Sequence, residues 1–61
     1  MIKLICRMNK VNNDTLYTVY ADGAPWFCLI EDDADDLIKK NEVKGFETVE
    51  TNFEYVEIYT F

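Results

Sequence analysis

The sequence predicts an α+β fold, in which an antiparallel β-sheet of element order β-β-β-α-β-β is covered by one helix. Three observations predict it. Apolar residues alternate over residues 2–8, an Asp-Gly pair at 22–23 separates two β-type segments, and the apolar spacing becomes helical after residue 31. The chain has 61 residues, 49% of them hydrophobic and 15% aromatic. Because a chain of this length can bury one core but not two, residues 1–61 are expected to form a single small domain.

The first strand is predicted over residues 2–8, where apolar side chains occupy every even position. The odd positions are mixed, so one face of this strand should be more buried than the other. The polar residues 9–14 then form a turn. If that turn is centred on Asn12-Asn13, Cys6 lies beside Val19 of the next strand.

A β-hairpin is expected over residues 15–30. Residues 15–21 are β-branched and aromatic, and Asp22-Gly23 favours a two-residue type I′ turn before residues 24–30. This register places Val19 opposite Trp26 and divides the hairpin between two faces. The first face carries Tyr17, Val19, Trp26, Cys28 and Ile30, and the second carries Leu16, Thr18, Tyr20, Phe27 and Leu29.

A short amphipathic helix is predicted from Asp32 onward, because Ala34, Leu37 and Ile38 fall at positions i, i+3 and i+4. Asp32 or Asp33 is expected to cap its N-terminus, and lysines fill its last turn. The chain then returns to β-type composition, which indicates that strands follow the helix.

The C-terminal segments 46–50 and 53–61 are the expected strands, separated by a turn or bulge. Tyr55 and Tyr59 alternate with Val56 and Ile58, so both faces of the last strand are partly apolar. It is either a central strand packed on two sides or an aromatic edge that meets a partner, since aromatic residues are enriched at binding hot spots.

Composition excludes several classes of function. Twelve Asp and Glu against six Lys and Arg give a net charge of −6, so direct binding to nucleic acid or an anionic membrane lacks its electrostatic driving force. The chain has no histidine, which removes the commonest general base and zinc ligand. The acidic run contains Ala34 and lacks the central Gly of a calcium loop. We therefore expect no enzyme, no metal site and no cofactor.

The two cysteines are expected to be reduced. Their number is far below that of a disulfide-built secreted domain, and the predicted register sets Cys6 and Cys28 two strands apart. The charged residues near the N-terminus interrupt any apolar stretch of the length that a signal peptide or membrane span needs. Both features favour a cytoplasmic protein.

The predicted sheet carries more apolar surface than one short helix can cover. With the helix on the face of Trp26 and Val19, the opposite face would be left bare, and large exposed apolar patches usually mark an interface. We therefore expect a homodimer, or contact with another protein, through this face or the terminal strand. The bare face would expose Ile5, Leu16, Tyr20, Phe27 and Leu29.

Negative charge is concentrated in the second half of the chain. Residues 1–30 hold two acids and three bases, whereas residues 31–61 hold ten acids and three bases. One interpretation is that the acids only cap and solvate the helix, with Asp35–Lys39 and Asp36–Lys40 as i, i+4 pairs. The other is that carboxylates spaced along the helix occupy the basic groove of a nucleic-acid-binding protein, as a DNA mimic would.

In size, charge and element order the chain resembles the small acidic proteins that bacteriophages encode against host enzymes. The residues concerned are the hairpin 17–29, the acidic helix and the return strand 44–50. Such proteins include anti-CRISPR proteins and inhibitors of uracil-DNA glycosylase, restriction enzymes and host RNA polymerase. The resemblance implies a stoichiometric inhibitor that occupies a surface of its target in the host cytoplasm.

Two functional hypotheses follow. The first is a non-enzymatic, phage-derived inhibitor that binds a nucleic-acid-handling enzyme or defence complex through its acidic helix. The second is a small dimeric accessory or regulatory module that recognises its partner through an apolar sheet face. For the first, the partner-binding residues are Glu31, Asp32, Asp33, Asp35 and Asp36; for the second, they are Tyr20, Phe27, Tyr55 and Tyr59.

Overall fold

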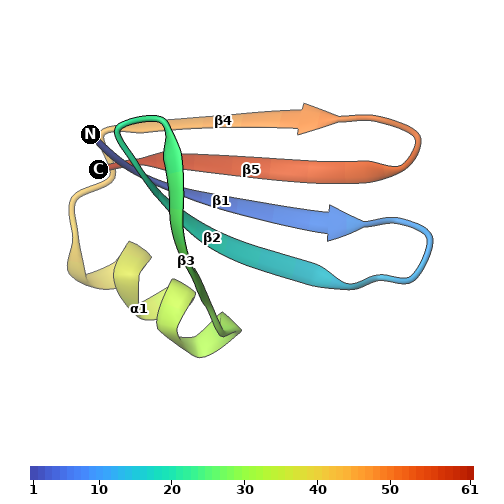
Figure 1. The fold of residues 1–61 in the computed structure, drawn as a ribbon, viewed down its shortest axis with the longest axis horizontal. Coiled ribbons are helices and arrows are strands. Elements are labelled where there is room, and N and C mark those ends of the chain that lie inside the picture. The colour runs from blue at the N-terminus through green and yellow to red at the C-terminus, as the bar shows by residue number, and fades with distance from the viewer.

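A computed structural model describes all of residues 1–61 and shows one antiparallel five-stranded sheet with one helix (Figure 1). The predicted α+β class and element order are confirmed. Along the sheet the strands are ordered β3-β2-β1-β5-β4. The elements are β1 (Ile2–Asn9), β2 (Thr15–Ala21), β3 (Ala24–Leu29), α1 (Glu31–Lys40), β4 (Gly45–Glu50) and β5 (Glu54–Thr60).

Strand β1 is the centre of the sheet, because it pairs with β2 on one side and β5 on the other. Its even positions lie on the helix side of the sheet, as the alternation predicted, and Leu4 among them is fully buried. The buried cluster beneath the helix consists of Leu4, Cys6, Val19 and Ala34. This small cluster holds the helix and the sheet together.

The register between β1 and β2 differs from the prediction by two residues. Cys6 lies opposite Tyr17, and Val19 lies opposite Leu4. The turn is longer than two residues, because the amide of Asn9 donates to the carbonyl of Asp14 at 2.8 Å. Since a shift of two residues preserves the faces of a strand, the apolar side still points toward the helix.

The β2–β3 hairpin has the predicted turn but not the predicted faces. Asp22 and Gly23 adopt φ values of 53° and 83°, as a type I′ turn requires. The register then shifts at Val19/Tyr20, where Trp26 is the extra residue of a β-bulge. A shift of one residue reverses every later side chain.

The predicted pairing of Val19 with Trp26 is therefore wrong, because Val19 lies opposite Phe27. Phe27 and Leu29 consequently share the helix side of the sheet, not the bare face to which the sequence assigned them. Cys28 lies on that opposite face instead, with its Sγ 3.7 Å from Oγ1 of Thr18. Both cysteines are free thiols.

The helix begins one residue earlier than predicted and has no side-chain cap. Its N-cap is Ile30 in an extended conformation, and the carbonyl of Ile30 accepts from the amide of Ala34 at 3.0 Å. The expected cap at Asp32 or Asp33 is wrong, because a single residue separates β3 from α1 and the turn begins directly at Glu31. These acids are consequently free of a capping role.

The helix covers only one end of the sheet. Figure 1 shows α1 beside the end that holds both chain termini, while the β1–β2 and β4–β5 hairpins extend away from it. A ten-residue helix is about 15 Å long, whereas an eight-residue strand is about 27 Å long. The outer half of the helix-side face therefore has no covering element.

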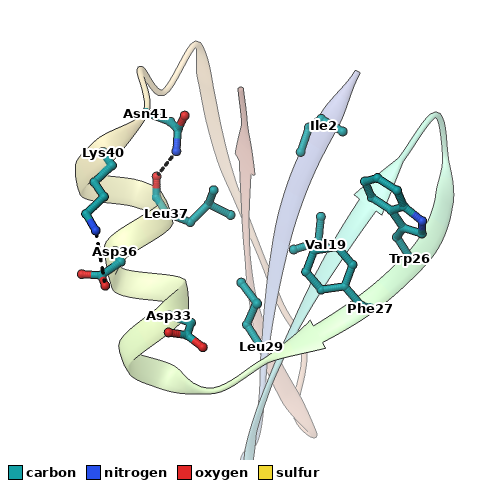
Figure 2. Close-up of a pocket in the computed structure, with 10 residues that line it drawn as sticks. All are labelled: Ile2, Val19, Trp26, Phe27, Leu29, Asp33, Asp36, Leu37, Lys40 and Asn41. Carbon is teal, nitrogen blue, oxygen red and sulfur yellow. Dashed lines mark hydrogen bonds and ion pairs between the residues drawn. The ribbon is translucent and has the colours of Figure 1, made fainter.

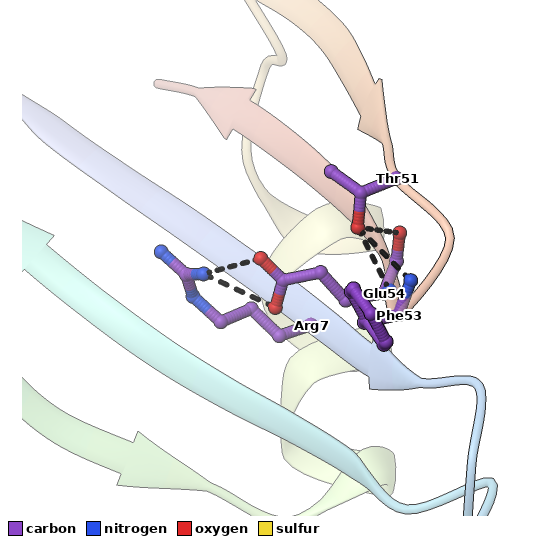
Figure 3. Close-up of polar contacts among 4 residues, drawn as sticks. All are labelled: Arg7, Thr51, Phe53 and Glu54. Carbon is purple, nitrogen blue, oxygen red and sulfur yellow. Dashed lines mark hydrogen bonds and ion pairs between the residues drawn. The ribbon is translucent and has the colours of Figure 1, made fainter.

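The opposite face of the sheet is partly protected by its own side chains. Val56 is buried there, opposite Arg7 on β1 and Val49 on β4. Arg7 Nη1 also contacts both carboxylate oxygens of Glu54, at 3.1 and 3.4 Å (Figure 3). At the adjacent hairpin, Thr51 Oγ1 accepts from the amide of Glu54 at 3.1 Å.

We expect Leu4→Ala to destabilise the fold by about 2–5 kcal/mol, because it leaves a cavity under the helix. A domain of this size has a total stability of only about 3–9 kcal/mol, so the variant should be partly or wholly unfolded. The measurement is equilibrium unfolding in urea. Leu16→Ala is the matched control: Leu16 is 52% exposed on the opposite face, and its loss should cost about 1 kcal/mol or less. Equal destabilisation by both variants would contradict the core described above.

Candidate functional site

The acidic helix displays its carboxylates to solvent with little compensation. Five side chains in its first two turns are acidic and exposed, and only Asp36 has a basic partner, with its Oδ2 3.8 Å from Nζ of Lys40. The expected Asp35–Lys39 pair is not formed. The five residues are Glu31, Asp32, Asp33, Asp35 and Asp36.

Several basic groups elsewhere are paired with acids of the strands and turns. Arg7 pairs with Glu54, Lys10 with Glu50, and the α-amino group of Met1 with Asp22. The contact between Met1 and Asp22 lowers the pKa of that carboxyl, through a hydrogen bond and the adjacent positive charge. These pairs involve none of the helix carboxylates, so the first two turns of α1 form a negative surface.

An apolar groove lies between α1 and the bulged strand β3, and we call it the hairpin groove. It encloses about 420 Å³ (Figure 2). Figure 2 shows Leu37 projecting from the helix, with Trp26 and Phe27 across from it. The ring centroids of Trp26 and Phe27 are 5.5 Å apart. The side chain of Trp26 is 67% exposed and that of Phe27 is 48% exposed. The groove is lined by Ile2, Val19, Trp26, Phe27, Leu29, Asp33, Asp36, Leu37, Lys40 and Asn41.

A second groove lies on the uncovered half of the helix-side face, and we call it the tyrosine groove. It encloses about 280 Å³ between β2, β1 and β5. Glu57 lies opposite Cys6, which lies opposite Tyr17, so these three side chains form a row across the sheet. The lining residues are Cys6, Met8, Thr15, Tyr17, Tyr55 and Glu57.

Burial and the carboxylates of the helix and β5 together raise the pKa values of side chains in and beside this groove. Burial raises the pKa of Cys6 to about 11, with smaller contributions from Glu57 and Asp35. Burial also raises the pKa of Tyr17, with help from the negative charge of Glu31. Tyr59 is shifted upward for the same reasons, burial first and then Glu57. The helix-side face of β2, β1 and β5 therefore lies in a negative electrostatic field.

The aromatic residues proposed as an apolar contact surface do not lie together. Tyr55 and Tyr59 are on the helix side of the sheet, as is Phe27, whereas Tyr20 is on the opposite face. Phe27 belongs to the hairpin groove and Tyr55 to the tyrosine groove. Tyr59 packs against Phe46 of β4, with ring centroids 4.9 Å apart.

Trp26 is the surface residue that sequence reasoning missed. The alternation assigned it to the covered face as part of the core, but it is 67% exposed at the bulge. Pro25, the residue before it, was an available signal. Proline in a strand favours an edge position or a bulge, because it cannot donate a backbone hydrogen bond.

No three side chains among the cysteines and acids are placed to hold a metal ion. The single helix is neither long enough nor apolar enough to cross a membrane. In comparisons with known proteins, no family model, no curated protein and no solved structure matches this chain.

We expect the stability of the protein to fall as pH rises from about 9 to about 11. The pKa of Cys6 is raised from 9.0 to about 11 in the folded state, so the unfolded chain loses this proton first. The protonated Cys6 thiol makes its full contribution to the free energy of unfolding below pH 9. That contribution, up to about 2–3 kcal/mol, is lost as pH rises through the pKa of the folded state. The upward shifts of Tyr17 and Tyr59 act in the same direction at the alkaline end.

Urea unfolding at a series of pH values measures this loss. Cys6→Ala is the test variant, and its pH slope rather than its absolute stability is compared with the parent, because removing the side chain also affects the core. Cys28→Ala is the control, since Cys28 is exposed. An unchanged slope in Cys6→Ala would contradict the assignment.

Proposed function

We propose that this protein is a non-enzymatic inhibitor that binds a nucleic-acid-handling protein or defence complex and blocks its basic groove with helix α1. The resemblance in format to phage-encoded inhibitors suggests a phage origin and action in the host cytoplasm. The observation that carries the proposal is the group of five exposed carboxylates in the first two turns of α1, four of them without a basic partner and none with a capping role.

The density of acidic residues in the first two turns of the helix is close to the charge density of duplex DNA. Residues 31–36 rise about 9 Å along the helix axis and carry five acids, which is about one negative charge per 1.8 Å. Duplex DNA carries about one negative charge per 1.7 Å of its axis. A groove that recognises a phosphate backbone through Lys and Arg would therefore meet a similar linear charge density here.

The packing of the helix on the sheet leaves its acids accessible to a partner. The helix packs on the sheet through Ala34, Leu37 and Ile38, while its five acids remain exposed to solvent. Lys39 and Lys40 lie in the last turn of α1, but only Lys40 pairs with one of the five acids, so a basic partner could contact the other four without displacing an ion pair.

The test begins with proteins that bind heparin in a bacterial lysate, because these share basic surfaces. They are captured on the immobilised protein, identified, and assayed for DNA binding by fluorescence anisotropy with and without added inhibitor. We expect stoichiometric release of DNA and an affinity that falls steeply with salt. A captured protein that keeps its DNA would contradict the proposal.

Variants that neutralise acids test whether inhibition depends on the carboxylates of the helix. The double variant Asp32→Asn/Asp33→Asn should weaken inhibition about tenfold or more, because it removes two unpaired charges from the helix. Asp14→Asn/Glu47→Gln is the matched control, since it removes two unpaired acids outside the helix and should have little effect. Equal weakening by both variants would mean that net charge, and not the helix, governs binding.

A second candidate function is favoured by the exposed pair Trp26 and Phe27. We propose as the alternative a small dimeric accessory module whose recognition is apolar and whose acids provide solubility. Trp is the residue type most enriched at binding hot spots, and this one stands beside an apolar groove. The other apolar surface, with Leu16 at 52% exposure, is the candidate for the homodimer contact.

If the alternative holds, Phe27→Asp should weaken partner binding about tenfold or more, with little dependence on salt. Phe53→Asp is the matched control, because Phe53 is 71% exposed at the β4–β5 hairpin, away from the groove. Sedimentation at micromolar concentration gives the oligomeric state in the same series. Unchanged binding by Phe27→Asp, or a monomer at all concentrations, would contradict this candidate.

A further inference from the structure

The tyrosine groove is a built recess and not a flat part of the sheet. Two tyrosines from different strands, Tyr17 on β2 and Tyr55 on β5, border it, and the apolar side chains of Cys6 and Met8 lie between them. Cys6 is buried, Met8 is partly buried, and both tyrosines are partly buried. The space is therefore bounded by partly buried, largely apolar side chains.

One carboxylate inside this recess has no partner in the protein. Glu57 is partly buried among these side chains, yet it forms no ion pair and no side-chain hydrogen bond. Asp35 of the helix is also unpaired, and both carboxylates lie near enough to the Cys6 thiol to raise its pKa. A carboxylate taken partly out of water gains most from a cation that can enter beside it.

We propose that the tyrosine groove binds an arginine side chain of the target protein, with the guanidinium against Glu57 and between the rings of Tyr17 and Tyr55. The arginine stem lies over Met8 and Cys6, which offer apolar contact to its methylene groups. This assignment extends the proposed function by naming a feature of the target, and it rests on that function only for the identity of the protein that supplies the arginine.

Arginine fits this recess better than lysine does. Its guanidinium is planar and weakly hydrated, stacks on aromatic rings and can donate two parallel hydrogen bonds to one carboxylate. A lysine ammonium is compact and strongly hydrated, so it gains less from rings and from a partly buried carboxylate. The hairpin groove offers a poorer site for a cation, because one of its acids, Asp36, is already paired with Lys40.

The experiment is an NMR titration of the isotope-labelled protein with acetyl-Gly-Arg-Gly-amide. We expect saturable shifts of the amides of residues 17, 55 and 57, with a dissociation constant on the order of millimolar for a single side chain. The citrulline peptide has the same shape without the charge, and it should cause no such shifts. The lysine peptide should bind at least about threefold more weakly than the arginine peptide.

Glu57→Gln preserves the shape of the side chain and should weaken arginine binding about fivefold. Glu47→Gln is the matched control, because Glu47 is an unpaired acid on the opposite face of the same sheet, and it should change binding less than twofold. Tyr55→Leu provides a second variant that removes a ring and keeps an apolar side chain. It too should weaken binding.

Three results would overturn the assignment: shifts confined to the outer face of α1, equal binding of the arginine and lysine peptides, or equal affinity of Glu57→Gln and the parent. Because this titration uses no target protein, its outcome is independent of the capture and DNA-release assays. Loss of arginine binding with intact inhibition would reject only the groove. Arginine binding without any inhibition would reject the proposed function and leave the groove.

Discussion

The arrangement of this protein depends on one mismatch of length. A helix of about 15 Å is laid on strands of up to about 27 Å, and its position is fixed by the single residue Ile30 before it and four residues after it. The contact that anchors it is Ala34 against the cluster of Leu4, Cys6 and Val19, where a small side chain lets the helix approach the sheet closely. Because the helix is short and close to the sheet, it leaves a groove on each side: one toward β3 and one over the outer half of the sheet. Both candidate binding surfaces are consequences of this geometry.

The ion pairs also differ between the sheet and the helix. Arg7 and Lys10 are on or next to the central strand, and each pairs with an acid near the β4–β5 hairpin that lies beside it in space. No base of the sheet pairs with an acid of the helix. The result is that three acids outside the helix are paired with bases, whereas four of the five helix acids are unpaired.

Local patterns in the sequence were sufficient to predict the strands and the helix. They were insufficient to predict the register between β2 and β3. The period of two in β1, the Asp-Gly turn and the helical spacing of Ala34, Leu37 and Ile38 each act within a few residues, and each prediction was confirmed. The bulge at Trp26 arises from pairing between strands, and strict alternation cannot represent an added residue. That one residue moved Phe27 and Leu29 to the helix side, so the predicted bare face lost two of its five members. The acidic residues were found from sequence because composition alone reveals them, whereas the tyrosine groove requires Tyr17 and Tyr55 to be brought together by the strand order β2-β1-β5.

The acids of α1 both stabilise the helix, through its dipole, and destabilise it, through repulsion between like charges. Acids in the first turn stabilise a helix through its dipole, by about 0.3–1 kcal/mol each when exposed, and Glu31, Asp32 and Asp33 benefit from this. Glu31 and Asp35 are like charges at i, i+4, as are Asp32 and Asp36, and such pairs oppose helix formation by about 0.2–0.5 kcal/mol each. Only Asp36–Lys40 offsets this within the chain. Asp35 and Asp36 lie beyond the first turn, so the dipole accounts for neither. The basic partner surface proposed above would relieve this repulsion, and that relief would add to the free energy of the proposed binding.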